Sequence, residues 1–433
     1  MKKKTPKDKT ITLCMIVKNE THIIKDCLQS MLPYIDRYDI TDTGSTDGTP
    51  ELIKEFFDEH NVPGEVYLSD WKGFGDHAGK TGSRTESLRN CDGKADYGWV
   101  IDADDYVTGN FEFPEVMEMD SYSLRIGRED FTWWRTQIFK MNVEWKYVGV
   151  LHEFAECGTK SPPETERIFG DYHVSARTEG ARNVGITTLE KYTKDAQDLE
   201  KALEDEPENS RYVFYLAQSY FDSQQYEKSL ETYLKRAGMG GWEEEAFYSL
   251  YRAGMLKALL DYSWPEIQQQ FLDAYDFRPI RAEPLYQIAR LYRQVHNKPR
   301  LGYTFAKMAI EIPYPKEDIL FISDDVYKWQ LLDELGASAY YAGKPHVGYH
   351  ACKRLVDENL VPESEKSRVV DNLKQYEQVV TMIQSQMAQE EVQNKIKEKE
   401  EKKQAKIDKV NKEKKGTKCN RDKKRKRKRK KRK

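Results

Sequence analysis

The chain has 433 residues, of which 38% are hydrophobic and 12% aromatic, a length and composition that predict two or three folded domains. The formal net charge is −3, but residues 391–433 hold 23 Lys or Arg and 7 Asp or Glu, so they carry +16 and leave −19 on the rest. The longest apolar stretches fall far short of the ~18 residues of a membrane-spanning helix, and the basic N-terminal segment lacks the apolar run of a secretory signal. The six cysteines are scattered and form no CxxC pair that could bind a metal. We therefore expect a cytoplasmic protein.

The first hundred residues alternate short strand-like segments with helical ones. We predict strands at residues 11–17, 39–41, 65–68 and 97–101, and helices at 23–31 and through 52–57. The first of these strands, ITLCMIV, has the continuous apolar pattern of a buried parallel strand. The order strand, helix, strand, helix is typical of a mostly parallel α/β sheet.

Three polar clusters follow predicted strands. They are Lys18 to Glu20, Asp42 to Asp47 and Asp102 to Asp105. In open α/β sheets ligands bind beyond the carboxyl ends of the strands. We therefore expect the three clusters to meet at one ligand site.

Asp102 and Asp104 form an Asp-x-Asp pair on a predicted tight turn. Two carboxylates offer the hard oxygen ligands that Mn²⁺ or Mg²⁺ prefers, and such an ion can bridge to a diphosphate. An acidic surface turn without a ligand is the alternative interpretation of this tripeptide alone.

The segment DTGSTDGT, residues 42–49, combines turn glycines with side chains that cap helices. The carboxylate of Asp42 at a strand end can also accept hydrogen bonds from a nucleobase or ribose. A capping loop without a ligand is the simpler interpretation, and both can hold for different residues.

The segments TLCMIVKNETHIIKDCLQSM, DTGSTDGT and VIDADD together resemble the hallmark segments of family 2 glycosyltransferases of the GT-A fold. The resemblance covers residues 10–180 and extends more loosely to about residue 380, as in members with a trailing tetratricopeptide-like region. It implies an α/β GT-A domain with a Rossmann-like, mostly parallel sheet, followed by an all-α repeat domain.

The resemblance also implies roles for single residues. Asp104 and Asp102 would bind the metal, with His173 completing its shell. Glu20 and Asp42 would bracket the nucleoside, in the cluster that begins with Lys18. Arg84 would contact the donor phosphates, although it matches the family's Arg-Asn segment only if an insertion follows Trp71.

The segment YVGVLHE resembles the family's Gly-x-x-His-Glu segment near the acceptor site. An inverting transfer needs a carboxylate to take the proton of the acceptor hydroxyl. Glu153 is the first candidate base and Asp130 the second, and an orienting role for Glu153 toward His152 is the alternative. Three tryptophans could stack on a sugar or fill a core: Trp133, Trp134 and Trp145.

After about residue 177 the pattern changes to amphipathic helices. Ala217-x-x-Tyr220 recurs at Ala289 and Ala337, with Ala253 midway, so a step of 36 residues relates the first three alanines. Such a period is typical of tetratricopeptide-type repeats, and an irregular helical bundle is the alternative. The predicted divisions are residues 1–9, a basic extension; 10–180, the GT-A domain; 181–385, the repeats; and 386–433, a charged tail that either frays as a helix or is disordered.

The resulting hypothesis is a metal-dependent, inverting transferase that moves a hexose from a nucleotide sugar, with a UDP-sugar favoured and Mn²⁺ or Mg²⁺ as cofactor. The acceptor would be a protein, peptide or glycan held by the helical repeats. The alternative is a non-catalytic repeat scaffold with a degenerate sugar-nucleotide domain. The basic tail could direct the chain to the nucleus, or to an anionic surface, through charge alone.

Overall fold

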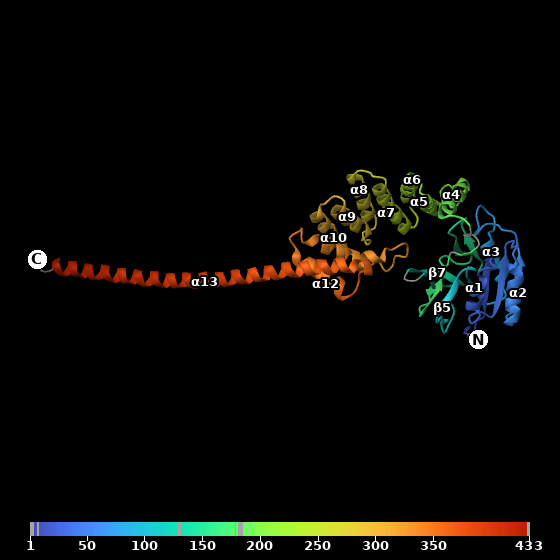
Figure 1. Cartoon of the computed structure of the whole chain (residues 1–433), viewed down its shortest axis with the longest axis horizontal. Helices are drawn as coiled ribbons and strands as arrows, with labels where there is room; N and C mark the ends of the chain where they lie inside the picture. The colour runs from blue at the N-terminus through green and yellow to red at the C-terminus, as the bar shows by residue number, and fades with distance from the viewer. Residues whose placement is uncertain (1–3, 7, 129–130, 178, 181–184, 431–433) are drawn as a thin grey trace. The chain divides into compact units, whose positions relative to one another are not determined.

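The computed structural model describes residues 4–6, 8–128, 131–177, 179–180 and 185–430. Contacts divide the chain into two units, residues 1–267 and 268–433, and the division falls inside one helix (Figure 1). The first unit contains a sheet domain and the first helices of the helical region. The second unit is entirely helical.

The sheet domain is built on a nine-stranded sheet with the order β3-β2-β1-β4-β7-β6-β11-β5, in which β10 pairs with β6. Within the described residues five pairings are parallel and three antiparallel, so the sheet is mostly parallel, as predicted. Strands β8 and β9 form a separate hairpin. The strands are β1 Ile11–Val17, β2 Arg37–Asp42, β3 Gly64–Leu68, β4 Tyr97–Val100, β5 Tyr106–Gly109, β6 Ser121–Arg128, β7 Phe131–Lys140, β8 Trp145–Val148, β9 Phe154–Cys157, β10 Thr165–Arg167 and β11 Tyr172–Ser175.

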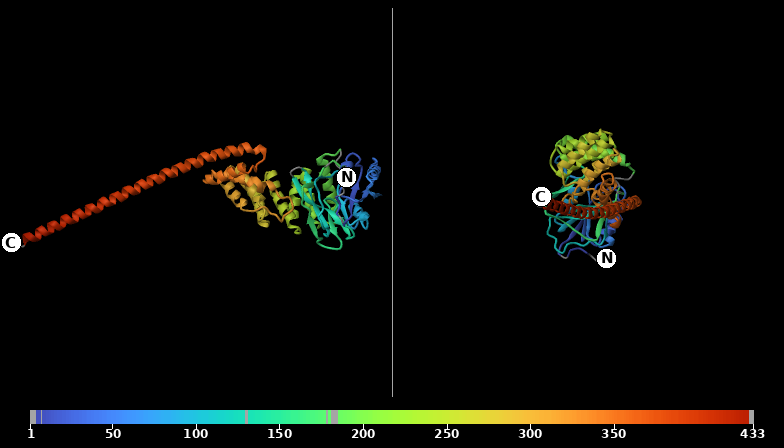
Figure 2. Two further views of the ribbon diagram at one scale, coloured as in Figure 1. Left: turned by 90° about the horizontal axis from the view of Figure 1, so that it is seen from below. Right: turned by 90° about the vertical axis from the view of Figure 1, so that its left-hand side faces the viewer.

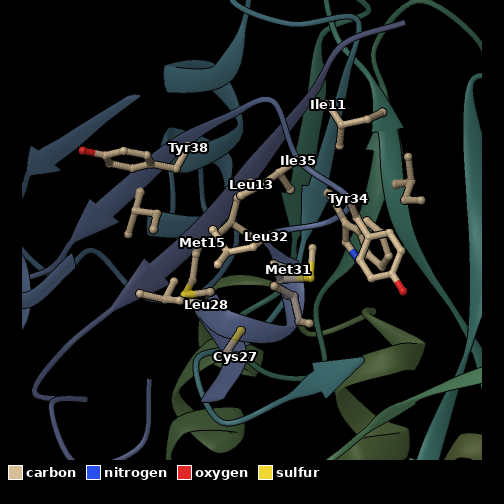
Figure 3. Packing of buried hydrophobic residues seen from close by; sticks show 14 of the residues in the cluster. Ile11, Leu13, Met15, Cys27, Leu28, Met31, Leu32, Tyr34, Ile35 and Tyr38 are labelled. Carbon is tan, nitrogen blue, oxygen red and sulfur yellow. The ribbon is translucent and has the colours of Figure 1, made fainter. Parts of the chain in front are cut away.

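The central strand β1 is buried along nearly its whole length because strands flank it on both edges and helices cover it. Figure 3 shows Leu13 and Met15 of β1 beside Leu28 and Met31 of α1, within one core cluster. The i, i+3, i+4 spacing of apolar residues on α1 explains this packing, because it puts them on one helix face. The helices of this domain are α1 Ile24–Met31, α2 Thr49–Glu59 and α3 Ser83–Cys91.

The predicted strands and helices up to residue 101 are present, with boundaries shifted by a few residues. The sequence analysis did not predict the second half of the sheet, where β6 and β7 run antiparallel. Polar residues interrupt the apolar pattern of these strands. Their pairing depends on contacts far along the chain, such as the pairing of β4 with β7.

Within each unit of the helical region, successive helices pack against one another, from α4 to α7 in the first unit and from α9 to α13 in the second. The first unit contains α4 Thr188–Asp205, α5 Ser210–Asp222, α6 Tyr226–Ala237, α7 Glu243–Leu259 and the start of α8 Trp264–Phe277. The second unit contains the rest of α8, then α9 Glu283–Gln294, α10 Pro299–Ile310, the π-helix η2 Val326–Gln330, α11 Leu331–Ala339, α12 Pro345–Asp357 and α13 Glu363–Lys430. An α/β domain followed by an all-α repeat region is therefore confirmed.

The repeated alanines lie where helices approach most closely. Ala217, Ala253 and Ala289 are completely buried on α5, α7 and α9. The hydroxyl of Ser229 on α6 donates to the carbonyl of Ala217, and a Cβ on Gly302 of α10 would lie 3.0 Å from the carbonyl of Ala289. Tyr340, which follows Ala337 in the repeated pattern, has an exposed side chain, and its backbone N–H donates to the hydroxyl of Tyr376.

Helix α13 continues through the segment for which the sequence left a fraying helix or disorder open (Figure 2). Lys and Glu four residues apart support a helix there, as in the pairs Glu391–Lys395 and Glu398–Lys402. None of the helices within the described ranges combines the length and apolar content needed to cross a membrane.

Candidate active site

A cavity of about 930 Å³ lies in the first unit, at the carboxyl ends of β1 and β4. Its walls also include the loop after β3, residues of β7 and one face of α4. All three predicted polar clusters contribute to it or border it. The charged lining residues are Lys18, Glu20, His77, Lys80, Arg84, Asp102, Asp104, Asp105, Arg135, Arg177, Lys191, Lys194, Asp195, Asp198, Lys201 and Asp205.

The loops after β1 and β2 bind each other through their side chains. The backbone N–H of Asn19, a residue with φ of 58°, donates to the Ser45 hydroxyl at 2.8 Å. In return, the side-chain oxygen of Asn19 accepts from the N–H of Thr46 at 2.8 Å. These bonds fix Lys18 and Glu20 at the cavity edge, where both were predicted to lie.

Asp42 is buried at the end of β2 beside this edge. Its Oδ1 atom accepts hydrogen bonds from the N–H groups of Gly44 and Ser45, so it shapes the turn as the capping interpretation requires. Its Oδ2 atom has no hydrogen-bond partner among the described residues. Asp42 itself does not line the cavity, but the next residue, Thr43, does.

Asp102 is held by two arginines. Nη2 of Arg84 lies 2.7 Å from Oδ1 of Asp102, and Nη1 of Arg135 lies 3.2 Å from Oδ2. Burial raises the pKa of Asp102, but the two guanidinium groups outweigh burial and hold that pKa well below its usual range. Asp102 is therefore a carboxylate with both oxygens occupied.

Asp104 and Asp105 complete an acidic cluster. Oδ2 of Asp104 accepts from the N–H of Gly180, and a Cβ on Gly180 would lie 3.1 Å from that oxygen and 3.5 Å from Oε1 of Glu20. Asp104 and Glu20 thus approach the same point of the chain. Burial, with the charges of Asp102 and Asp104, raises the pKa of Asp105 to about 8. Burial is thus the main cause of the raised pKa of Asp105, and the neighbouring carboxylates add to it.

Glu153 contacts Arg84 rather than open space. Its Oε1 atom lies 2.6 Å from Nε of Arg84, and both side chains are about nine-tenths buried. Glu153 does not appear in the cavity wall, although Val150 and Leu151 do. His152 instead stacks on Tyr215 of α5, with ring centroids 4.0 Å apart. Glu153 thus lies outside the cavity wall and forms its ion pair with Arg84, in place of the alternative orienting contact with His152.

The structure does not bring His173 to the acidic cluster. His173 lies on β11 opposite Thr108 of β5, and its ring nitrogen Nδ1 is 3.0 Å from the Thr108 hydroxyl. It does not line the cavity. Within the described residues, no group of three or more His, Cys, Asp or Glu side chains is arranged to hold a metal ion. The prediction that His173 completes a metal shell is therefore not supported by its position.

The other aromatic and acidic candidates have separate outcomes. Trp133 lines the cavity and is largely exposed. Trp145 is buried against Phe139, so it belongs to the core. Trp134 packs against Phe169, away from the cavity wall. Asp130 lies outside the described residues.

Two parts of the wall were missed from the sequence. Arg135 lies on β7, whose position next to β4 is a tertiary feature. Helix α4 presents Lys191, Lys194, Asp198, Lys201 and Asp205 to the cavity. Their spacing of three or four residues places them on one helix face, a signal that the sequence carries but that is also typical of a solvated face.

Residues 12–123 match the family model described as glycosyl transferase family 2. The predicted resemblance is therefore confirmed for the segment that contains β1 to β5 and the Asp102–Asp105 cluster. No curated protein matches the chain in sequence.

Several solved structures resemble part of the chain. MamA has 14% identity over 43% of this chain and 99% of its own, with a TM-score of 0.31. BtubC from P. vanneervenii has 17% identity over 38% of this chain and 71% of its own, with a TM-score of 0.32. YrrB, described as a TPR protein with an unusual peptide-binding site, has 12% identity over 39% of this chain and 77% of its own, with a TM-score of 0.28.

Proposed function

We propose, on the premise that residues 12–123 match family 2 glycosyl transferases, that the chain transfers a hexose from a nucleotide sugar, with a UDP-sugar favoured, to an acceptor hydroxyl. The observation that carries the proposal is the convergence of Glu20, Arg84, Asp102 and Asp104 on one cavity in and around the matched strands. A scaffold would not require these charged groups to be gathered there.

The acidic cluster has the chemistry of a site for Mn²⁺ or Mg²⁺. Asp102 and Asp104 line the same cavity, together with Asp105 and Glu20, so four carboxyl groups are gathered there. Mg²⁺ is commonly bound by one or two carboxylates plus substrate phosphates, so two protein ligands suffice. A bound divalent ion would stabilise the negative charge that develops on the leaving diphosphate.

The protein's own groups would position the donor. Asp42 and Glu20 would accept hydrogen bonds from the nucleoside, with Lys18 nearby at the cavity edge. The Arg84 guanidinium would bind diphosphate oxygens, for which its planar donors are suited.

In the transfer, the acceptor oxygen forms a bond to the anomeric carbon while the bond from that carbon to the diphosphate oxygen breaks. Glu153 is our proposed base for the acceptor proton. Its ion pair with Arg84 at 2.6 Å means that a diphosphate bound to Arg84 would compete for the same guanidinium and release a carboxylate oxygen.

Helix α4 supports a role of the helical region in holding the acceptor. Its Lys194, Asp198 and Lys201 side chains line the cavity together with Trp133. Hydrogen-bond donors and acceptors beside an aromatic ring suit a hydroxyl-rich acceptor. We therefore propose a protein, peptide or glycan acceptor that binds against α4, the first helix of the helical region.

The test is donor turnover. The full chain would be incubated with a panel of nucleotide sugars, with and without Mn²⁺, while the released nucleoside diphosphate is measured. The expected result is metal-dependent release from one donor, lost in Asp104→Ala. Asp58→Ala, which removes an exposed acid of α2 outside the cavity, is the matched control and should retain activity.

The same samples distinguish the scaffold alternative. If no donor is turned over, calorimetry with UDP and GDP in the presence of Mn²⁺ follows. Binding without turnover would indicate that an acceptor is required. Absence of both binding and turnover would contradict the proposed transferase and favour the scaffold.

A further inference from the structure

Both carboxylate oxygens of Asp102 are paired with arginines. Arg84 occupies Oδ1 at 2.7 Å and Arg135 occupies Oδ2 at 3.2 Å. A divalent cation at Asp102 would have to displace a guanidinium or share a carboxylate with it. Two adjacent positive charges would also repel the cation. These two ion pairs therefore oppose metal binding at Asp102, which the proposed function requires as a metal ligand.

The two arginines differ in how firmly they are held. Arg84 is about nine-tenths buried and is also paired with Glu153. Arg135 makes its ion pair only with Asp102 among the described residues, and about a third of its side chain is exposed to the cavity. A guanidinium is charged at every accessible pH, so proton loss cannot release Asp102. A competing anion can, because phosphate oxygens bind guanidinium groups in the same two-point manner as a carboxylate.

We propose that Arg135 is a positioning residue that pairs with Asp102 before the donor binds and moves to the donor diphosphate when the donor binds. The movement of Arg135 to the diphosphate rests on the proposed function, whereas its pairing with Asp102 does not. Asp102 then becomes available to the cation at the moment when the diphosphate arrives. Metal and nucleotide bind cooperatively as a result, and by linkage each increases the affinity of the other by the same factor.

The first test uses Mn²⁺ alone, with the full chain and no nucleotide. Free Mn²⁺ is measured by electron paramagnetic resonance during a titration of the wild type and of Arg135→Gln. Removal of the covering guanidinium should tighten Mn²⁺ binding by about tenfold or more, which is opposite to the loss expected from a merely damaged site. Arg167→Gln, which removes an arginine of β10 outside the cavity, is the matched control and should bind Mn²⁺ as the wild type does.

Two further variants connect the effect to Asp102. The double variant Asp102→Asn with Arg135→Gln should not show the tighter Mn²⁺ binding of Arg135→Gln, because the carboxylate of Asp102 is then absent. Arg135→Lys keeps the charge but not the fork of donors, so it should bind Mn²⁺ with intermediate affinity. Circular dichroism and thermal unfolding verify that each variant is folded. Equal or weaker Mn²⁺ binding by both folded Arg135 variants would overturn the proposal.

The second test adds UDP or GDP to the same titrations. In the wild type the nucleotide that binds should tighten Mn²⁺ binding, and in Arg135→Gln this coupling should shrink several-fold. If Arg135→Gln tightens Mn²⁺ binding but neither nucleotide binds either protein, the proposed donor site fails while the covering of Asp102 stands. If the coupling is the same in both proteins, the movement of Arg135 to the diphosphate is refuted.

Discussion

Nη2 of Arg84 lies 2.7 Å from Oδ1 of Asp102, so an ion pair between a buried arginine and a half-buried aspartate joins the first turn of α3 to the loop after β4. The pair therefore links α3 to the acidic cluster. The guanidinium that is proposed to bind the donor is thus also a structural partner of the proposed metal ligand.

Arg84→Met should destabilise the fold. The change leaves the carboxylates of Asp102 and Glu153 short of a buried partner, and breaking such a pair typically costs about 3–5 kcal/mol. Urea unfolding, monitored by circular dichroism, gives the free energy of unfolding. Arg89→Met, an exposed arginine of the same helix, should change it by less than about 0.5 kcal/mol. Equal losses in the two variants would contradict the structural role of the Arg84 ion pairs.

Asp47 should contribute stability that depends on pH. Burial raises its pKa, but hydrogen bonds from Thr49 and Thr21 outweigh burial and lower the pKa to about 2. Because the folded-state pKa lies below the unfolded value of 3.8, the contribution is complete above about pH 4 and disappears as the pH falls toward 2. The group is largely exposed, so we expect at most about 1 kcal/mol at pH 7.

The measurement for Asp47 is the difference in unfolding free energy between the wild type and Asp47→Ala at several pH values. The difference should be constant from pH 5 to 7 and shrink below pH 4. A difference that grows on acidification would show the opposite sign of linkage.

Asp42→Asn should weaken nucleotide binding more than it weakens folding. Its free Oδ2 atom can accept a hydrogen bond from the nucleoside, and a carboxylate accepts more strongly than an amide. We expect about tenfold weaker binding of the nucleoside diphosphate by calorimetry. The affinity for the nucleoside without its phosphates should fall by the same factor, because Asp42 would contact the base or ribose rather than the phosphates. Loss confined to the diphosphate would reassign Asp42.

The double variant Lys194→Ala with Lys201→Ala should raise the KM for the acceptor several-fold, once an acceptor is identified. Both side chains line the cavity from one face of α4, and the change removes two hydrogen-bond donors. Glu204→Ala, an exposed residue of the same helix outside the cavity, should leave the KM unchanged. An unchanged KM in the double variant would exclude α4 from the acceptor site.

Gly348→Ala should destabilise the second unit. A Cβ at this position of α12 would lie 2.2 Å from the ring of Tyr376 on α13, so either that ring or the helices must shift. Overpacking of this kind costs about 1–3 kcal/mol, measurable as a lower Tm. Gly238→Ala is the control, because a Cβ there would make an ordinary contact at 3.6 Å. A Tm equal to that of the control would show that α12 and α13 can move apart at no cost.

The sequence alone determined much of the sheet's first half and the repeat pattern. Residues 11–17 and the segment with Ile24, Leu28 and Met31 have apolar periods that only one local structure satisfies. The turn residues around Asp42 and Asp102 mark the ends of parallel strands, and parallel strands bring those ends to one edge. The convergence of the three polar clusters could therefore be predicted.

Only the tertiary structure decided which groups meet across long stretches of chain. Arg135 reaches Asp102 because β7 pairs with β4, and His173 misses the cluster because β11 pairs with β5. Both are polar residues on strands whose partners are set by packing and not by local propensity. The sequence specifies local apolar periodicity and turns, whereas the pairing of strands far apart in the chain is selected by the burial of the whole sheet.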